Sequence, residues 1–478
     1  MRWALTGLAV LGLIAGGIAA ALESAAVPPR LAAAYLERRA EGHGSIDGKS
    51  LRWLARWLEA RDRGTAGLPL LPALRVGVVP ATAPAASAAA RALPALAGSA
   101  DQLREAVARA QPGDVITLVA GRYRFDAAAI AITRPGLAGQ PITVRADLPG
   151  TVQLEFAQEQ GFLVSAPYWT FENLDIRGVC RDQNDCEHAF HVVGKGHHFV
   201  ARNNRITDFN AQFKINGEGG AVPDDGLIEN NTLGNTTVRQ TDRPVTPIDL
   251  VAASGWTIRR NLISDFAKAG GDQTSYGAFA KGGGRGTRFE GNIVLCDFRL
   301  GRPPGRRVGL SLGGGGSDKA ACRDRQCITE QEEGVIESNL VAFCSDEGIY
   351  LNRAATSRVL HNTLVDTAGI AVRFAESSAE VEGNLVDGLA RSRDGGALHA
   401  SDNLSTAAPW LYLGWHPQRE LFKGAETLDF GWHAAPPRRA SGPAASTDLC
   451  GRPRPPQPAY GAFEDFSSCI LPAGPARP

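Results

Sequence analysis

Titratable side chains that could donate and accept protons recur in separate short segments of the chain, one or two in each. Phe190 and Val192 alternate with His191, so a strand here would point His191 away from the core. The same alternation predicts outward pairs in the following segments: His191 with Val193, Lys214 with Asn216, Asp249 with Val251, Phe279 with Lys281, Ser311 with Gly313, Tyr350 with Asn352, and Ala371 with Arg373. A surface that combines His, Lys, Asp and Tyr could carry general acid–base chemistry.

Two sets of candidate residues follow from this surface. The candidate catalytic residues are Lys214, Asp249, Lys281, His191 and Tyr350. The candidate ligand-binding residues are Arg285, Arg373, Asn216, Asn352 and His188. Taken singly, each is more often an ordinary surface residue, and an exposed Lys–Asp pair contributes under about 1 kcal/mol. The cluster as a whole lies beside glycine-rich turns at 282–284 and 313–316, which would let a bulky ligand approach the backbone.

An internal repeat predicts the elements that hold these side chains in line. Asparagine followed closely by apolar residues recurs at positions 173, 204, 231, 261, 292, 339, 362, 384 and 403, at intervals of 31, 27, 30, 31, 47, 23, 22 and 19 residues. Each coil has too few apolar residues for its own core, but stacked coils share one. An asparagine tolerates the left-handed region at a tight turn, and its amide can bond the equivalent amide of the next coil.

The repeat predicts an all-β fold, a right-handed parallel β-helix over 99–405. Leucine-rich repeats would show more constant spacing, and a β-propeller would lack this asparagine register. Ser99 is the expected N-cap of a capping helix over 101–109. We expect a helical segment over 27–67, an Ala/Pro-rich linker over 68–98 and an irregular tail over 406–478. Since parallel strands lie about 4.8 Å apart, His191, Lys214 and Asp249 should stack as neighbours.

The N-terminus has the features of an export signal. Residues 4–22 carry no charge, and small residues at 19–21 and 24–26 offer cleavage sites, so residues 1–26 are either a cleaved signal peptide or a retained membrane anchor. Eight cysteines in an exported chain predict disulfides. The close pairs Cys180 with Cys186 and Cys322 with Cys327 could each pin a loop, and Cys296 with Cys344 and Cys450 with Cys469 would complete the set, although sequence alone does not fix the connectivity. We expect a bacterial protein that is periplasmic, anchored in the envelope or secreted.

The charge balance limits the kinds of partner. The 478 residues include 50 basic and 50 acidic side chains, so the formal net charge is zero. This balance argues against nucleic-acid binding by a basic face. The sequence has no phosphate-binding loop, no HExxH and no GxSxG. We expect a monomer.

The solenoid segment resembles the polysaccharide lyases of the chondroitinase B and alginate lyase type, in the wider pectate-lyase-like superfamily. The resemblance covers 99–405 and rests on Pro112-Gly113-Asp114-Val115-Ile116 with Gly121-Arg122-Tyr123, on coils such as Trp256-Thr257-Ile258-Arg259-Arg260-Asn261, and on the closing Gly461-Ala462-Phe463-Glu464. It implies an envelope protein that cleaves an acidic, uronate-containing polysaccharide by β-elimination. Such lyases neutralise the uronate carboxylate and remove its C5 proton, with a Lys base, an Arg and often Ca²⁺ held by carboxylates.

The family's catalytic set is not preserved at the equivalent positions. Counting back from Asn261, the expected Lys falls on Ala252 and the expected carboxylates near Val245 and Pro247. The expected Arg falls at Lys281 or Gly282. The cofactor is therefore unknown, and Ca²⁺ stays open although its ligand positions are not matched.

A rearranged set of residues is our hypothesis for the reaction: Lys214 or Lys281 as base, Arg285 or Arg373 to neutralise the carboxylate, His191 or Tyr350 as acid, and Asp249 to orient Lys214 or bind a cation. Two other activities stay open, a C5-epimerase and a β-helix glycosidase. The glycosidase needs two carboxylates about 5 to 9.5 Å apart, and only Asp249 lies among the outward pairs. The non-enzymatic alternative is a polysaccharide-binding or envelope-scaffold protein.

Overall fold

The computed structural model describes residues 16–41, 46–64, 71–79, 95–314, 318–441 and 447–471. Most of the expected signal peptide or anchor lies outside these ranges, and residues 16–25 are helical. Within the described part of the chain, the helices are all too short or too polar to span a bilayer.

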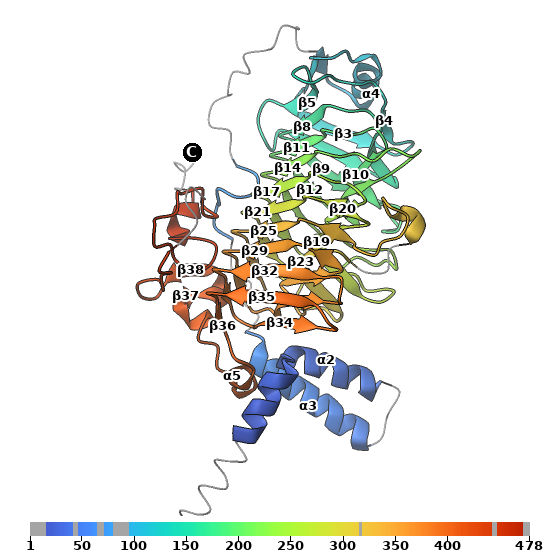
Figure 1. Ribbon diagram of the computed structural model, residues 1–478. Coiled ribbons are helices and arrows are strands. Elements are labelled where there is room, and N and C mark those ends of the chain that lie inside the picture. The colour runs from blue at the N-terminus through green and yellow to red at the C-terminus, as the bar shows by residue number, and fades with distance from the viewer. Residues whose placement is uncertain are drawn as a thin grey trace, which may run out of the picture.

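Three long parallel sheets form a solenoid, to which successive coils add one strand per sheet (Figure 1). The sheet that carries the predicted outward residues is called the groove sheet. Its strands are β4 (Ile130–Ile132), β7 (Gln160–Val164), β10 (His188–Val193), β13 (Ala211–Asn216), β16 (Ile248–Val251), β19 (Thr274–Lys281), β23 (Arg306–Leu312), β27 (Ile349–Asn352), β31 (Gly369–Arg373) and β34 (Leu389–Arg393).

The other two long sheets complete each coil. The charged sheet contains β1 (Ala95–Ala97), β2 (Val115–Leu118), β5 (Ile142–Ala146), β8 (Trp169–Glu172), β11 (Val200–Arg202), β14 (Leu227–Glu229), β17 (Thr257–Arg259), β21 (Arg288–Glu290), β25 (Val335–Glu337), β29 (Ser357–Leu360), β32 (Ser378–Glu382) and β35 (Ala397–Ser401). The tail sheet contains β3 (Gly121–Phe125), β6 (Val152–Phe156), β9 (Asp175–Gly178), β12 (Arg205–Thr207), β15 (Thr232–Gly234), β18 (Leu262–Ser264), β22 (Ile293–Leu295), β26 (Leu340–Ala342), β30 (Thr363–Val365), β33 (Leu385–Val386) and β36 (Leu404–Ser405). The predicted all-β, right-handed parallel β-helix is confirmed.

Shorter elements flank the solenoid. The helices are α2 (Pro29–Ala40), α3 (Ile46–Asp62), α4 (Ala100–Arg109) and α5 (Ala408–Leu413). A side sheet holds β20 (Gly284–Arg285), β24 (Gln331–Glu332) and β28 (Ala354–Ala355), and the C-terminal tail holds the antiparallel pair β37 (Phe422–Gly424) and β38 (Asp429–Trp432).

The core of the early coils is a stack of phenylalanines. The rings of Phe162 and Phe190 lie 5.0 Å apart, and those of Phe190 and Phe213 lie 5.3 Å apart, both in stacked geometry. All three side chains are fully buried. Because each inward residue meets its equivalent in the next coil, one continuous core replaces many small ones, which is why the alternation of residues along each strand is so regular.

A ladder of asparagine amides runs along the corner between the charged sheet and the tail sheet. The Nδ2 atom of Asn261 donates to Oδ1 of Asn292 at 3.0 Å, and Asn292 donates to Asn339 at 2.9 Å. The same bond continues through the later coils to Asn403. These buried amides satisfy one another, and each also bonds backbone groups of neighbouring coils, so the ladder fixes the register of the coils.

The position of the left-handed residue in this turn differs from the prediction. The ladder asparagines are not themselves left-handed; the residue before each one is, as at Arg260 with φ of 55° and Ser338 with φ of 56°. Asn173 pairs in register with Asn203 rather than with Asn204, and its own φ is 63°, so the ladder starts one coil later than the sequence repeat suggested. The ladder amide must point inward, and the residue before it makes the bend.

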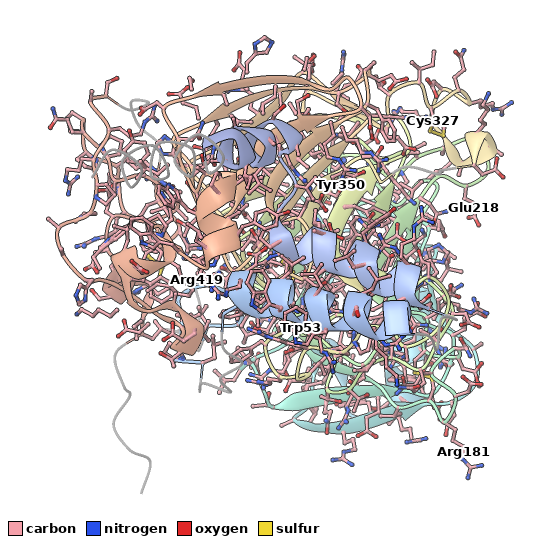
Figure 2. All side chains as sticks on the ribbon, turned by 90° about the horizontal axis from the view of Figure 1, so that it is seen from below. Trp53, Arg181, Glu218, Cys327, Tyr350 and Arg419 are labelled. Atoms are coloured by element: carbon pink, nitrogen blue, oxygen red, sulfur yellow. A yellow bond between two sulfur atoms is a disulfide. The ribbon has the colours of Figure 1, made fainter. Side chains whose placement is uncertain are left out.

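The two ends of the solenoid are covered differently. At the start, α4 buries Leu103 and Val107 on the first coil, and Ser99 Oγ accepts from the Gln102 amide at 3.2 Å, as expected for its N-cap. At the other end lies the helical cap, defined as residues 16–64 with α2 and α3 (Figure 1). Figure 2 views the molecule from this end and labels Trp53 on the cap. The helices of residues 29–40 and 46–62 thus lie at the end of the solenoid where its last coil lies.

The cap is held to the last coils by buried ion pairs. Arg30 lies between Asp62 at 2.8 Å and Asp366 at 2.9 Å, with both carboxylates and the guanidinium almost fully buried. Arg419, from the tail, donates to the backbone oxygen of Asp62 at 2.9 Å. The cap, the solenoid and the tail therefore share one polar network.

The segments expected as linker and tail both pack on the tail sheet. Leu74 and Val76 are buried there, and the amide of Val79 donates to Asn203 Oδ1 at 2.8 Å, so residues 71–79 run back along the solenoid. Phe463 and other tail aromatics join the same apolar cluster. All four predicted disulfides are present: Cys180–Cys186, Cys296–Cys344, Cys322–Cys327 and Cys450–Cys469.

Candidate active site

The structure places the predicted outward residues side by side on the groove sheet. His191 pairs in register with Lys214, Lys214 with Asp249, and Asp249 with Phe279. Further along, the register continues through Phe279–Ser311, Ser311–Tyr350, Val251–Lys281 and Asn352–Arg373. The alternation therefore predicted the correct face and register. The catalytic roles assigned to these residues stay predictions.

At the early coils, five residues form what we call the His–Lys–Asp cluster: His188, His191, Lys214, Asn216 and Asp249. Lys214 Nζ donates to Asp249 Oδ2 at 2.8 Å, and His191 Nε2 lies 2.8 Å from Asn216 Oδ1. The rings of His188 and His191 are 4.9 Å apart. Asp249 is buried and the Lys214 side chain is about one-fifth exposed, at 22%. The Asp249 carboxylate thus fixes the position of the Lys214 ammonium group, while part of the Lys214 side chain stays exposed to solvent.

Both histidines of this cluster are neutral at pH 7. Burial lowers the pKa of His191, and the hydrogen bond to Asn216 only partly opposes this effect. Burial, together with the positive charges of Lys214 and Arg243, lowers the pKa of His188 to about 2. The Nδ1 atom of His191 is buried and, among the described residues, has no hydrogen-bond partner. Nε2 lies against Asn216 Oδ1, which can only accept, so Nε2 carries the proton of the neutral ring and donates it to this oxygen. Nε2 can meet a ligand once Asn216 releases it, and it can act as a base only after the ring proton has moved to Nδ1.

A second group lies at the later coils, the Tyr–Arg cluster of Tyr350, Asn352, Arg373 and Tyr276. Tyr350 Oη accepts from Arg373 Nη1 and from Asn352 Nδ2, both at 3.2 Å. Arg373 also pairs with Asp394 at 2.5 Å. Burial is the main cause that raises the pKa of Tyr276 to about 12, so this phenol keeps its proton at neutral pH.

The two clusters are too far apart to act on one bond. Tyr350 lies on β27 and His191 on β10, five strand-to-strand steps away in the groove sheet. At about 4.8 Å per step the separation is about 24 Å. Lys281 lies between them, with Nζ 4.5 Å from the centre of the Phe279 ring. The candidate residues therefore form two separate clusters on one sheet, not one catalytic set.

Arg285 lies apart from both clusters. It belongs to the side sheet, where it pairs with Glu332 at 3.2 Å and Glu333 at 3.4 Å. The guanidinium is therefore already matched by carboxylates outside the groove sheet. A role in carboxylate neutralisation would require those pairs to break.

Sequence alternation missed Tyr276 because the strand bends at a glycine. Tyr276 has the same parity as the inward-facing Ala278, yet it contacts Tyr350 and Val308 on the outer face. Gly277 lies between them, stacked on Gly309 of the next coil, where a Cβ on Gly277 would come within 2.8 Å of the Gly309 oxygen. Glycines at equivalent positions of successive strands were the signal for this bend.

Comparisons with known proteins concern the fold. No family model matches the chain, and no curated protein matches it. A similar solved structure is the pectate lyase Pel9A, with 14% identity, a TM-score of 0.46, and coverage of 76% of this chain and 90% of that one. A rhamnogalacturonan lyase has 12% identity and a TM-score of 0.39, covering 64% of this chain and 81% of its own. An alginate lyase from Paenibacillus sp. str. FPU-7 has 14% identity and a TM-score of 0.35, covering 65% and 94%.

The fold is a parallel β-helix of three long sheets. At these identities the likeness says nothing about chemistry, so the reaction has to be argued from the residues of this chain. The Ca²⁺ site of such lyases is a first test. Val245 and Ala252 are buried apolar residues at the positions counted for its ligands and base, and neither offers a side-chain oxygen. Across the described residues there is also no group of three or more His, Cys, Asp or Glu side chains suited to a metal ion. The residues of this chain therefore do not reproduce that Ca²⁺ site, and the reaction proposed below does not use the ion.

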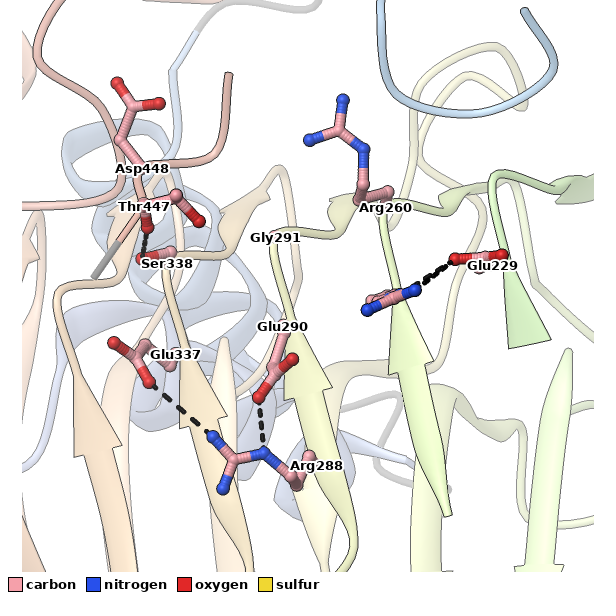
Figure 3. Close-up of a pocket in the computed structure, with 10 residues that line it drawn as sticks. Glu229, Arg260, Arg288, Glu290, Gly291, Glu337, Ser338, Thr447 and Asp448 are labelled. Carbon is pink, nitrogen blue, oxygen red and sulfur yellow. Dashed lines mark hydrogen bonds and ion pairs between the residues drawn. The ribbon is translucent and has the colours of Figure 1, made fainter. Parts of the chain in front are cut away.

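A cavity of about 460 Å³ lies on the charged sheet beneath the tail (Figure 3). Most of its charged residues are already in ion pairs: Arg259 with Glu229 at 2.8 Å, and Arg288 with Glu290 and, at 4.0 Å, with Glu337. Arg260 donates to the backbone oxygen of Arg75 at 2.9 Å. Such cross-strand pairs on neighbouring coils stabilise the sheet surface. The groove sheet, with its neutral histidines and partly exposed ammonium, is the better candidate for chemistry.

Proposed function

We propose that the protein is a polysaccharide lyase that cleaves an acidic, uronate-containing polymer by β-elimination at the His–Lys–Asp cluster. The observation that carries this proposal is a neutral imidazole, His191, directly beside an ammonium group, Lys214, on an outward-facing parallel sheet. A base and a cation one strand apart match the two needs of the reaction, because the carboxylate must be neutralised before the proton next to it can leave.

Each residue has a separate task in this scheme. Lys214 contacts the uronate carboxylate, and Asp249, 2.8 Å from its Nζ, positions that ammonium group. Asn216 turns its amide to the substrate and releases Nε2, the proton of the neutral ring moves from Nε2 to Nδ1, and His191 then takes the C5 proton at Nε2. The electron pair of the broken C5–H bond forms the C4–C5 double bond, the C4–O bond breaks, and the departing oxygen takes a proton from solvent.

This scheme differs from the hypothesis of a lysine base. The Lys214 ammonium already donates to the Asp249 carboxylate, whereas burial lowers the pKa of the neighbouring His191 imidazole. Tyr350 lies about 24 Å away by strand spacing, too far to serve as the acid for the same bond. We therefore place Tyr350 in substrate binding along the groove.

Export is part of the proposal. Four disulfides persist in oxidising compartments, and a polymeric substrate of the envelope would be met outside the cytoplasm. The uncharged N-terminal stretch supports the same location.

The test is incubation of the purified protein with alginate, pectate, chondroitin and heparin-type polymers, read by the ultraviolet absorbance of unsaturated uronates. His191→Gln and Lys214→Met should each lower the rate by about 10²-fold or more, because proton transfer and charge stabilisation each contribute at least that much. Arg358→Ala on the charged sheet is the matched control and should leave the rate unchanged.

Other outcomes would point elsewhere. New reducing ends without ultraviolet absorbance would replace the lyase by a glycosidase. Binding without either product would support the polysaccharide-binding scaffold, and full activity in both groove variants would remove the His–Lys–Asp cluster from the mechanism.

A further inference from the structure

The groove sheet is covered at its last coils by the start of the helical cap. Arg391 on β34 donates from Nη1 to the backbone oxygen of Ala26 at 2.9 Å, immediately before α2. Arg373 and Arg393 pair in register on β31 and β34, and both face the same segment. The outer face of the groove sheet is therefore blocked at this end by residues from the other end of the chain.

A cavity of about 470 Å³ lies between α2 and these strands, and we call it the end pocket. The wall from the groove sheet and its flanking turn is strongly basic, with four arginines and one carboxylate, namely Arg306, Arg373, Arg391, Arg393 and Asp346, and a fifth arginine, Arg38, lines the cavity from α2. The opposite wall, from the cap, is mostly apolar and includes Leu31 and the ring of Tyr35. A pocket with one charged and one apolar wall suits a ligand that has both an anionic group and an apolar face.

The arginines of the end pocket outnumber the acidic groups that pair with them. Arg306 pairs with Asp346 at 2.5 Å and Arg373 with Asp394 at 2.5 Å. Arg391 and Arg393 share one carboxylate, Glu347, at 2.7 and 3.8 Å. Three carboxylates thus face five guanidinium groups, which leaves an excess of two positive charges around the cavity.

Arg391 is the innermost of these groups. Its side chain is only 3% exposed, and its buried Nε has no hydrogen-bond partner among the described residues. Burial and the neighbouring positive charge of Arg393 both act against its charged form, which lowers its pKa to about 10. An anion in the end pocket would relieve both effects, because it would bring negative charge to a desolvated guanidinium.

We propose that the end pocket binds the anionic terminal residue of an acidic oligosaccharide, so that the groove engages its ligand from one chain end. Arg373 links the pocket to the open groove, since the same guanidinium lines the cavity and donates to Tyr350 Oη. A chain anchored here would pass Tyr350 and Asn352 and continue toward the His–Lys–Asp cluster. The saccharide nature of the ligand rests on the proposed function; the binding of an anion in the pocket does not.

The experiment measures binding by titration calorimetry with uronate oligosaccharides of defined length, a neutral glucan oligosaccharide and inorganic sulfate. Two variants address the pocket from its two walls: Arg393→Glu reverses an accessible charge, and Leu31→Trp fills the space from α2. Each should weaken uronate oligosaccharide binding about tenfold or more, since one charge-assisted contact contributes that much. Arg358→Glu, a charge reversal on the charged sheet, should leave the affinity unchanged.

The outcomes separate this inference from the proposed function. Weaker binding in both pocket variants supports the end pocket even if no polymer is cleaved. Unchanged binding in both variants overturns it even if the protein proves to be a lyase. Equal affinity for sulfate and for the oligosaccharide would show a plain anion site and overturn recognition of a chain end. If cleavage occurs, release of short products from the start supports end recognition, and early random fragmentation of the polymer overturns it.

Discussion

His188 should make the folded state sensitive to mild acid. Its side chain is buried, its Nδ1 has no partner among the described residues, and its pKa is lowered to about 2. In the unfolded chain a histidine titrates near pH 6.5, so between these two values the unfolded state binds the extra proton. The contribution of the neutral His188 ring to the free energy of unfolding is therefore complete above about pH 6.5 and is lost progressively as the pH falls toward 2.

The size of this loss follows from the two pKa values. At pH 5 the unfolded ring is about 97% protonated and the folded ring is neutral, which corresponds to 1.5 pH units of proton-binding free energy, or about 2 kcal/mol. At pH 4 the same calculation gives about 3.4 kcal/mol. His361, whose pKa is lowered to about 3 by burial and by nearby arginines, should add a loss of similar sign. His416 acts in the opposite direction, since its bond to Asp387 contributes to a raised pKa.

The assay is urea unfolding followed by circular dichroism at pH 8, 7, 6 and 5, for the wild type and for His188→Asn. The wild type should lose about 2 kcal/mol more than the variant between pH 8 and pH 5. Because the variant could rearrange its surroundings, the ring protons of His188 should also be followed by NMR, and they should not titrate between pH 8 and pH 4. An equal pH dependence in both proteins, or a ring that titrates near pH 6, would refute the reasoning.

Three further perturbations test the structure elsewhere. Asn292→Ala removes a rung of the amide ladder and leaves buried polar groups without partners on both neighbouring coils, so it should lower the free energy of unfolding by about 3 kcal/mol. Asn403→Ala, at the end of the ladder, should cost clearly less, and equal losses for the two variants would contradict a continuous ladder. Arg30→Met leaves the buried carboxylates of Asp62 and Asp366 without their shared partner, so it should lower the free energy of unfolding by about 3 to 5 kcal/mol and speed proteolysis of the cap. Unchanged proteolysis would show that the cap is held by other contacts. Replacing Cys296 and Cys344 by alanine opens a loop of 48 residues and should lower the unfolding free energy by about 4 kcal/mol in denaturant titration; a loss below about 1 kcal/mol would show that the unfolded chain is already compact there.

The sequence by itself determined the coil, its register and the covalent links. Apolar residues alternate with polar ones because each strand has one buried face, so the outward position of His191, Lys214 and Asp249 could be predicted with no knowledge of distances. The recurring asparagines marked one corner of the coil. Cysteine spacing suggested four pairs without fixing their connectivity, and the structure contains these same four disulfides.

Sequence patterns failed where a local rule was broken or where the partner is remote in the chain. Strict alternation put Tyr276 in the core because it does not account for a bend at Gly277. No pattern within residues 27–67 indicated that this segment would cover the last coils, because Arg30 and Asp366 are more than 300 residues apart and their pairing depends on the whole solenoid between them.

Only the tertiary structure decided which candidate residues can work together. Strand spacing over five steps separates His191 from Tyr350, burial lowers the pKa of His191, and Asp249 fixes the position of the Lys214 ammonium group. Protonation depends on the atoms that surround a group in three dimensions, and those atoms come from other coils. Residue types therefore indicated acid–base chemistry, and the packing of the coils decided which of these residues lie close together and which end of the sheet the cap covers.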